Sequence, residues 1–218
     1  VFFESSFNGD YLWGMLLIAG ITLAYTLFGG FLGASLTDVV QGLMMVIALI
    51  AVPVIAIFSI GGIDRTAELV AENSTPGHLS MFGGDVITGA TILAIVSSLA
   101  WGLGYFGQPH IIVRFMALRS PQEAKSARRI GISWMVVSLI GAVVSGLVGI
   151  AYVAAKGIDL KNPETVVLLM SQTLLHPFVA GLVLAAVVAA IMSSISSQLI
   201  VCSSALIEDL YKVFRKDP

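Results

Sequence analysis

The sequence PFVAGLVLAAVVAAIMSSISSQLIVCSSALI, at residues 177–207, decides the fold class of this chain. It contains no charged side chain, and it is longer than the roughly 20 apolar residues that an α-helix needs to cross a bilayer. It also lacks the short alternating pattern that is typical of a membrane β-strand. Residues 177–207 are therefore predicted to form a transmembrane helix.

Other intervals between charged residues have the same length and character. They predict four further spans, at residues 11–28, 39–60, 86–113 and 130–155. A shorter stretch, 165–175, is predicted to be a helix lying at the membrane interface. We therefore expect residues 1–218 to form a single all-α polytopic membrane domain with five transmembrane helices.

The composition supports a membrane protein and excludes other classes. Hydrophobic residues make up 57% of the chain and charged residues 11%, against about 25% charged in soluble domains. The net charge of −2 gives no basic surface for nucleic acid. Cys202 is the only cysteine, so an internal disulfide or a cysteine-based metal site is excluded. No Walker loop, zinc motif or nucleophile elbow occurs, and we expect no enzyme activity.

The loop charges predict the orientation, because Lys and Arg concentrate on the cytoplasmic side of membrane proteins. The loop at 114–129 carries five basic residues and one acidic residue, so it is predicted to be cytoplasmic. The stretch at 61–85 is mainly acidic and is predicted to be external. The tail with Lys212, Arg215 and Lys216 is then predicted to lie inside. The chain starts at Val1 without an initiator Met, and we expect it to be an internal piece of a longer protein.

The third expected span changes character at residues 100–110, AWGLGYFGQPH. Three glycines at about 1 kcal/mol each and a proline at about 3 kcal/mol make a continuous helix unfavourable between Gly102 and Pro109. Broken helices at membrane depth are typical of transporter binding sites. Trp101, Tyr105 and Pro109 share one face at helical spacing and are candidates to line a substrate pocket. A glycine-packed helix contact with ordinary interfacial aromatics is the alternative.

The fifth expected span is rich in serine. Most of these hydroxyls are expected to bond to the carbonyl one turn earlier or to join helices. Ala190, Ser193 and Ser194 are spaced at i, i+3 and i+4, so a carbonyl and two hydroxyls can reach one point. Neutral oxygen ligands of this kind suit a monovalent cation such as sodium.

Asp38 stands at the expected boundary of the second span, after Thr37. The pair is expected to start that helix, with Asp38 at the positive end of the helix dipole. A functional role for this carboxylate is the alternative.

Four motifs, in order along the chain, resemble the solute:sodium symporter family. Residues 29–42, GGFLGASLTDVVQG, are similar to the conserved cytoplasmic turn of that family. The run 128–130, RRI, with the glycines that follow it, resembles a second signature. Residues 101–110, WGLGYFGQPH, and residues 198–204 with 208–212 are similar to the sodium/proline branch of the family.

This resemblance implies a LeuT-type core of ten helices in two inverted repeats. The five spans would be core helices four to eight, with the broken span as core helix six. It implies that the Ala190 carbonyl and the Ser193 and Ser194 hydroxyls bind Na⁺, the coupling ion. Trp101, Tyr105 and Pro109 would lie on the proline pathway, and Asp38 would act in sodium-dependent transport. Core helix one, with the other sodium ligands, would belong to the rest of the same transporter chain.

The resemblance implies sodium-coupled symport of L-proline across the cell membrane, with the lipid bilayer as the surrounding partner. Pantothenate, sugars or another small solute are the alternatives within the family. A channel or a non-transporting membrane sensor built on the same helices is the alternative outside it.

Overall fold

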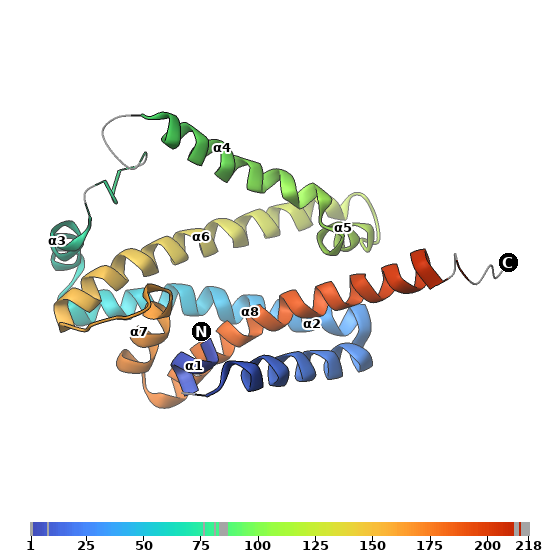
Figure 1. The fold of residues 1–218 in the computed structure, drawn as a ribbon, viewed down its shortest axis with the longest axis horizontal. Helices are drawn as coiled ribbons and strands as arrows, with labels where there is room; N and C mark the ends of the chain where they lie inside the picture. Colours follow the sequence, from blue (N-terminus) through green and yellow to red (C-terminus); the bar gives the residue numbers. More distant parts are fainter. Residues whose placement is uncertain are drawn as a thin grey trace.

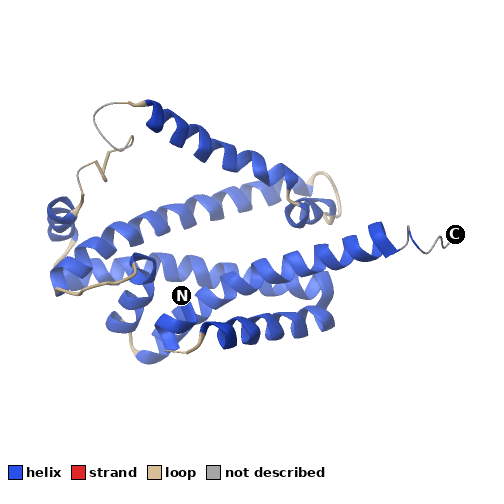
Figure 2. Ribbon diagram, in the orientation of Figure 1, coloured by secondary structure: helices blue, strands red, loops and turns tan. Residues whose placement is uncertain are grey.

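The computed structural model describes residues 2–7, 9–75, 77–80, 82, 87–211 and 214. Within these residues all regular secondary structure is helical, as Figure 2 shows. The elements are α1 (Phe2–Phe7), α2 (Tyr11–Ile60), α3 (Ile63–Asn73), α4 (Gly89–Gly104), η1 (Tyr105–Gly107), α5 (Pro109–Met116), α6 (Glu123–Lys156), η2 (Pro163–Thr165), α7 (Val166–Leu174), α8 (Pro177–Ser204) and the π-helical η3 (Ala205–Tyr211). The expected all-α class is confirmed.

Helix α2 contains 50 residues, about 75 Å if it were straight, so it is too long for one span. Gly30 interrupts it with φ 53° and ψ −150°, a left-handed conformation that favours glycine. The chain reverses its direction at this turn, and the second part of α2 runs back (Figure 1). Gly30 thus separates two apolar helical segments, which the sequence assigns to 11–28 and 39–60.

The expected helix start at Thr37 and Asp38 is wrong. The second part of α2 is helical directly after Gly30, so both residues lie inside it. The Thr37 hydroxyl donates to the carbonyls of Gly33 and Ala34, 3.1 and 2.8 Å away, which is the return bond of a serine or threonine within a helix. A single glycine with positive φ makes the reversal without the longer turn that the sequence suggested.

The expected break in the third span is confirmed. Helix α4 ends at Gly104, a short 3₁₀ turn covers Tyr105–Gly107, Gln108 is extended, and α5 restarts with Pro109 at its first position. The two helices meet at an angle of 45°. The start expected for this span, Val86, and the acidic Asp85 before it lie outside the described residues, as do Lys212, Arg215 and Lys216.

The core lies where α2, α6, α7 and α8 pack together. Six of its eight buried residues are alanine or valine: Ala48, Val52, Ala56, Val148, Tyr152, Met170, Val183 and Ala186. Small side chains let membrane helices approach closely. Van der Waals packing then stabilises the helix contacts, because the hydrophobic effect does not favour helix association inside lipid. Helix α7 packs against this core, with Met170 fully buried. Its position at a membrane interface stays a prediction.

Among the described residues, α2, α6 and α8 with its π-helical extension are long and apolar enough to cross a membrane. The bent pair α4 and α5 makes a fourth candidate. Figure 1 shows α4 extending apart from the packed helices, while α5 lies near α8. No residue of α4 is buried. The break therefore joins α4 to a helix that contacts α8, although no residue of α5 is buried either.

Candidate functional site

An ion pair between Asp38 and Arg114 joins α2 to α5. Asp38 lies on the second part of α2, and Arg114 lies near the end of α5. The Nη2 atom of Arg114 donates to Oδ2 of Asp38 at 2.5 Å. The Asp38 side chain is only 10% exposed and the Arg114 side chain 45%. A carboxylate buried in an apolar helix needs such a partner, because an unpaired charge there is strongly unfavourable.

The same guanidinium nitrogen also reaches α8. Arg114 Nη2 donates to the hydroxyl of Ser197 at 2.5 Å, and Ser197 is 8% exposed. The Ser197 hydroxyl in turn donates to the carbonyl of Ser193 at 2.9 Å. The chain of bonds therefore runs from α2 through α5 to the serine cluster of α8.

A cavity of about 600 Å³ lies beside this network. Asp38, Gln41 and Gly42 of α2, Arg114 of α5, Trp134 of α6 and Ser193 of α8 are among the residues that line it. Trp134 Nε1 donates to the Gly42 carbonyl at 3.2 Å and so joins α6 to α2 there. Within the described residues, Oδ1 of Asp38 and Oε1 of Gln41 are buried without a hydrogen-bond partner. Polar side chains therefore interrupt a cavity lining that is otherwise mostly apolar.

The three predicted sodium ligands lie on one stretch of α8. The Ser194 hydroxyl donates to the Ala190 carbonyl at 3.3 Å, so these two oxygens are neighbours. This bond is also the return bond that a purely structural serine would make. Ser193 is half-buried and lines the cavity, whereas Ser194 is exposed. Only Ser193 of the three therefore faces the polar network in this structure.

The predicted substrate residues lie around the helix break. The rings of Trp101 and Tyr105 meet edge to face, with centroids 4.8 Å apart and an interplanar angle of 80°. Trp101 is 68% exposed, and Pro109 begins α5 beyond the break. None of the three lines the cavity beside Ser193. The structure thus joins the two aromatic residues to each other but does not bring them to the serine cluster.

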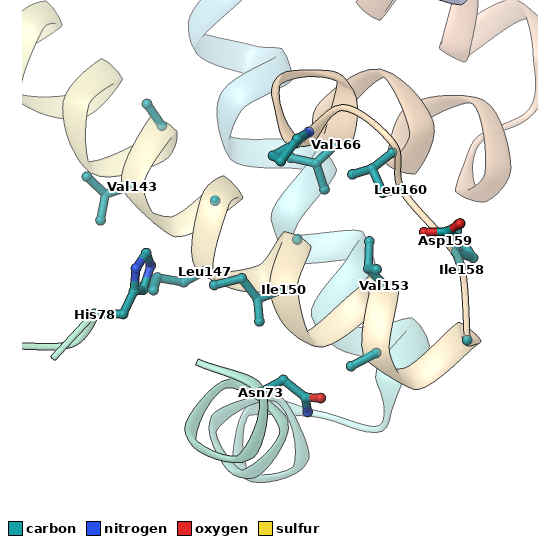
Figure 3. Close-up of a pocket in the computed structure, with 16 residues that line it drawn as sticks. Asn73, His78, Val143, Leu147, Ile150, Val153, Ile158, Asp159, Leu160 and Val166 are labelled. Carbon is teal, nitrogen blue, oxygen red and sulfur yellow. The ribbon is translucent and has the colours of Figure 1, made fainter. Parts of the chain in front are cut away.

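A larger cavity, of about 870 Å³, lies between α6, α3 and the segment 157–166 (Figure 3). Its lining is mostly apolar, and Asn73, His78 and Asp159 are its polar residues. The Asn73 amide is already bonded to the Leu69 carbonyl at 2.8 Å. None of the residues that the sequence predicts to bind substrate or sodium lines this cavity, so we do not place the candidate site there.

Sequence reasoning missed Arg114 and Ser197 as members of the site. Arg114 was counted only as a charge of the cytoplasmic loop, and Ser197 only as one of several structural serines. One feature of the sequence could have predicted the contact: Asp38 and Arg114 are each a single charged residue at the end of a long apolar run. Opposite charges of this kind tend to pair inside a membrane protein.

The described residues hold no group of three His, Cys, Asp or Glu side chains that could bind a metal ion. The oxygen atoms at Ala190, Ser193 and Ser194 are neutral, which suits a monovalent cation better than a divalent one. This chemistry fits the sodium ligands that the sequence predicted, and the assignment stays a prediction.

Comparison with known proteins gives the family. The chain is 53% identical over 213 residues to sodium/proline symporter 2 of Staphylococcus saprophyticus, covering 98% of this chain and 40% of that protein. It is 50% identical to the osmoregulated proline transporter OpuE of Bacillus subtilis, covering 97% of this chain and 42% of that protein. It is also 50% identical to the high-affinity proline transporter PutP of the same species, covering 99% and 45%. No solved structure matches.

The chain therefore spans less than half the length of these curated relatives. The profile of the sodium:solute symporter family matches residues 1–218. With the all-helical fold and the apolar helices, this match makes the chain part of a polytopic membrane protein. The chain belongs to the sodium:solute symporter family.

Proposed function

We propose that the whole protein is a secondary transporter that couples the entry of a small organic solute, L-proline, to the entry of Na⁺. The observation that carries this proposal is identity of 50 to 53% over nearly the whole chain to proteins named as proline transporters or sodium/proline symporters. The broken helix and the polar network beside α8 support it, because transporters bind substrate and ion at such interruptions.

The Ala190 carbonyl and the hydroxyls of Ser193 and Ser194 are the proposed sodium ligands of this chain. Supporting this assignment, the Ala190 and Ser194 oxygens are 3.3 Å apart and Ser193 lines the polar cavity. A sodium ion that loses its water needs more oxygen ligands than these three. The remaining ligands belong to core helix one, in the rest of the same transporter chain.

Trp101, Tyr105 and Pro109 are proposed to line the path of proline. An edge-to-face aromatic pair beside a helix break offers an apolar surface for the pyrrolidine ring. The backbone groups freed between Gly104 and Pro109 can meet the charged amino and carboxylate groups of the substrate. Asp38, held by Arg114, is proposed to act in sodium-dependent transport from the neighbouring cavity.

Coupling then follows from thermodynamic linkage. If sodium and proline both bind best to the same outward-facing state, each raises the affinity for the other by the same factor. The sodium gradient across the cell membrane thereby drives proline accumulation. The LeuT-type arrangement of ten core helices supplies the two states in this proposal.

Uptake of labelled proline by the full-length protein in lipid vesicles tests the proposal. An inward sodium gradient should drive saturable accumulation above the external concentration, and a potassium gradient should not. A channel would not concentrate the solute, and a sensor would not move it. Competition by excess pantothenate or a sugar, without competition by unlabelled proline, would contradict the assigned substrate.

A further inference from the structure

Arg114 is a single side chain through which three helices meet. It belongs to α5, the half of the broken span that follows the break. Its Nη2 atom bonds both to Asp38 of α2 and to Ser197 of α8, each at 2.5 Å. Asp38 and Ser197 lie 76 and 83 positions from Arg114 in the sequence, so these contacts connect segments that are far apart along the chain.

The position of α5 relative to its neighbours depends on these contacts. If α5 tilts about the break at Gln108, Arg114 has to leave both acceptors. Asp38 would then be a nearly buried carboxylate without its cation, a state that is strongly unfavourable unless another group replaces the guanidinium. The pair therefore holds α5 in the orientation that the structure shows.

The contact with Ser197 carries this orientation to the serine cluster. The Ser197 hydroxyl accepts from Arg114 and donates to the Ser193 carbonyl, so the two bonds polarise each other. Ser196 also donates to the Ser193 carbonyl, at 3.0 Å, and no bond joins it to Arg114. Two adjacent serines thus differ in one contact, the bond to the guanidinium.

We propose that Arg114 is a positioning residue that, through Ser197, couples the tilt of α5 to the sodium affinity of the Ser193 region of α8. This inference rests on the proposed sodium site at Ala190, Ser193 and Ser194. When α5 is docked, Arg114 fixes Ser197 and with it the backbone that carries Ser193. When α5 moves away, that constraint is lost and the sodium affinity changes. Helix movement at the substrate break and ion binding on α8 thereby become one equilibrium.

The test uses the full-length protein in lipid vesicles and measures the sodium concentration for half-maximal proline uptake. Ser197→Ala removes the acceptor on α8 and leaves the pair of Arg114 and Asp38 intact. We expect it to shift the half-maximal sodium concentration by about fivefold, at unchanged protein abundance. Ser196→Ala is the matched control, with an expected shift within about twofold. Ser197→Thr keeps the hydroxyl and should restore the wild-type value.

A second arm shows whether the effect passes through Arg114. The double variant Asp38→Asn, Arg114→Gln removes both charges and so avoids an unpaired buried carboxylate. Because Asp38 is proposed to act in transport, sodium binding is read in this background without uptake, as the rise in melting temperature of the purified protein with added Na⁺. There, Ser197→Ala should cause no further shift in the half-maximal sodium concentration. If Ser197→Ala does not accumulate, Ser197→Cys, a weaker acceptor of similar volume, takes its place.

The outcomes separate the inference from the function on which it rests. If wild-type protein shows no sodium-dependent proline uptake, the proposed function is wrong. If wild-type uptake depends on sodium but Ser197→Ala behaves like Ser196→Ala, the coupling through Arg114 is wrong and the proposed function stands. If Ser197→Ala shifts the half-maximal sodium concentration as much in the charge-free background as in the wild-type protein, the coupling through Arg114 is also wrong.

Discussion

At the scale of single residues, Asp38 determines how this region is built. An acidic side chain inside an apolar helix is unfavourable unless a cation or donors surround it. Arg114 provides the cation for Oδ2, while Oδ1 is buried without a partner among the described residues. The polar network is therefore arranged around a charge that the surrounding helices alone would not stabilise.

Ser193→Ala and Ser194→Ala test the proposed sodium ligands in the full-length protein. Each change deletes one hydroxyl and leaves a similar volume, so we expect a higher half-maximal sodium concentration at nearly normal abundance. Removal of a ligand from a dehydrated ion typically lowers affinity by about tenfold or more. Sodium titrations of proline uptake, with quantified protein, give the answer.

Ser196→Ala is again the control, because Ser196 is fully buried and bonds only to the backbone carbonyl of Ser193 among the contacts described. Wild-type sodium dependence in both ligand variants would contradict the assignment. Equal impairment of the Ser196 control would point to packing of α8 instead.

The sequence proposes sodium ligands on α8 but does not predict their surroundings, and the ligand assignment stays a prediction. Spacing at i, i+3 and i+4 singled out Ala190, Ser193 and Ser194, and the neighbouring oxygens of Ala190 and Ser194 agree with that spacing. The partner of Asp38 is 76 residues away, and no local pattern encodes such a contact. Asp38 was therefore interpreted as a helix cap, which the structure contradicts.

At the scale of helices, the glycines show which elements approach closely. A Cβ atom added at Gly141 of α6 would lie 3.0 Å from Cβ and 3.1 Å from the carbonyl oxygen of Leu49 on α2. An added Cβ at Gly146 would meet no atom of the described residues within 4 Å. The two glycines are five residues apart, about 1.4 turns of the same helix, so they face different directions.

Gly141→Ala is therefore expected to destabilise the protein, because the added methyl pushes α6 away from the backbone of α2. Overpacking of this kind costs about 1–3 kcal/mol, whereas Gly146→Ala should be neutral or stabilising by up to about 1 kcal/mol. Thermal unfolding of the two full-length variants in the same detergent compares them. A lower melting temperature for Gly146→Ala than for Gly141→Ala would contradict this packing.

Helix interiors were easier to predict than helix ends. Charge-free runs located the apolar segments, and the glycines and Pro109 located the break, because both signals are local. The ends depend on single hydrogen bonds. Thr88 and Thr91 form a reciprocal cap at the start of α4 that the sequence does not predict. Gly30 alone makes the reversal between the two spans predicted at 11–28 and 39–60.

At the scale of the whole molecule, the loop charges predict the orientation in the membrane. Ser126 lies exposed in the first turn of α6, next to the basic residues of the 114–129 stretch. A cysteine at this position, in a protein in which exposed Cys202 is replaced by Ser, should react with an impermeant reagent only from the cytoplasmic side. Labelling from the outside of intact cells would reverse the predicted topology.

The central claim is that sodium and proline cross the membrane together, and a flux measured in the reverse sense tests it most directly. The full-length protein is placed in lipid vesicles with equal sodium on both sides and proline only outside. Because a symporter carries both solutes in the same direction in one cycle, the inward proline gradient should drive uptake of radioactive sodium above its external level. Proline entry without any accompanying sodium uptake would contradict the account.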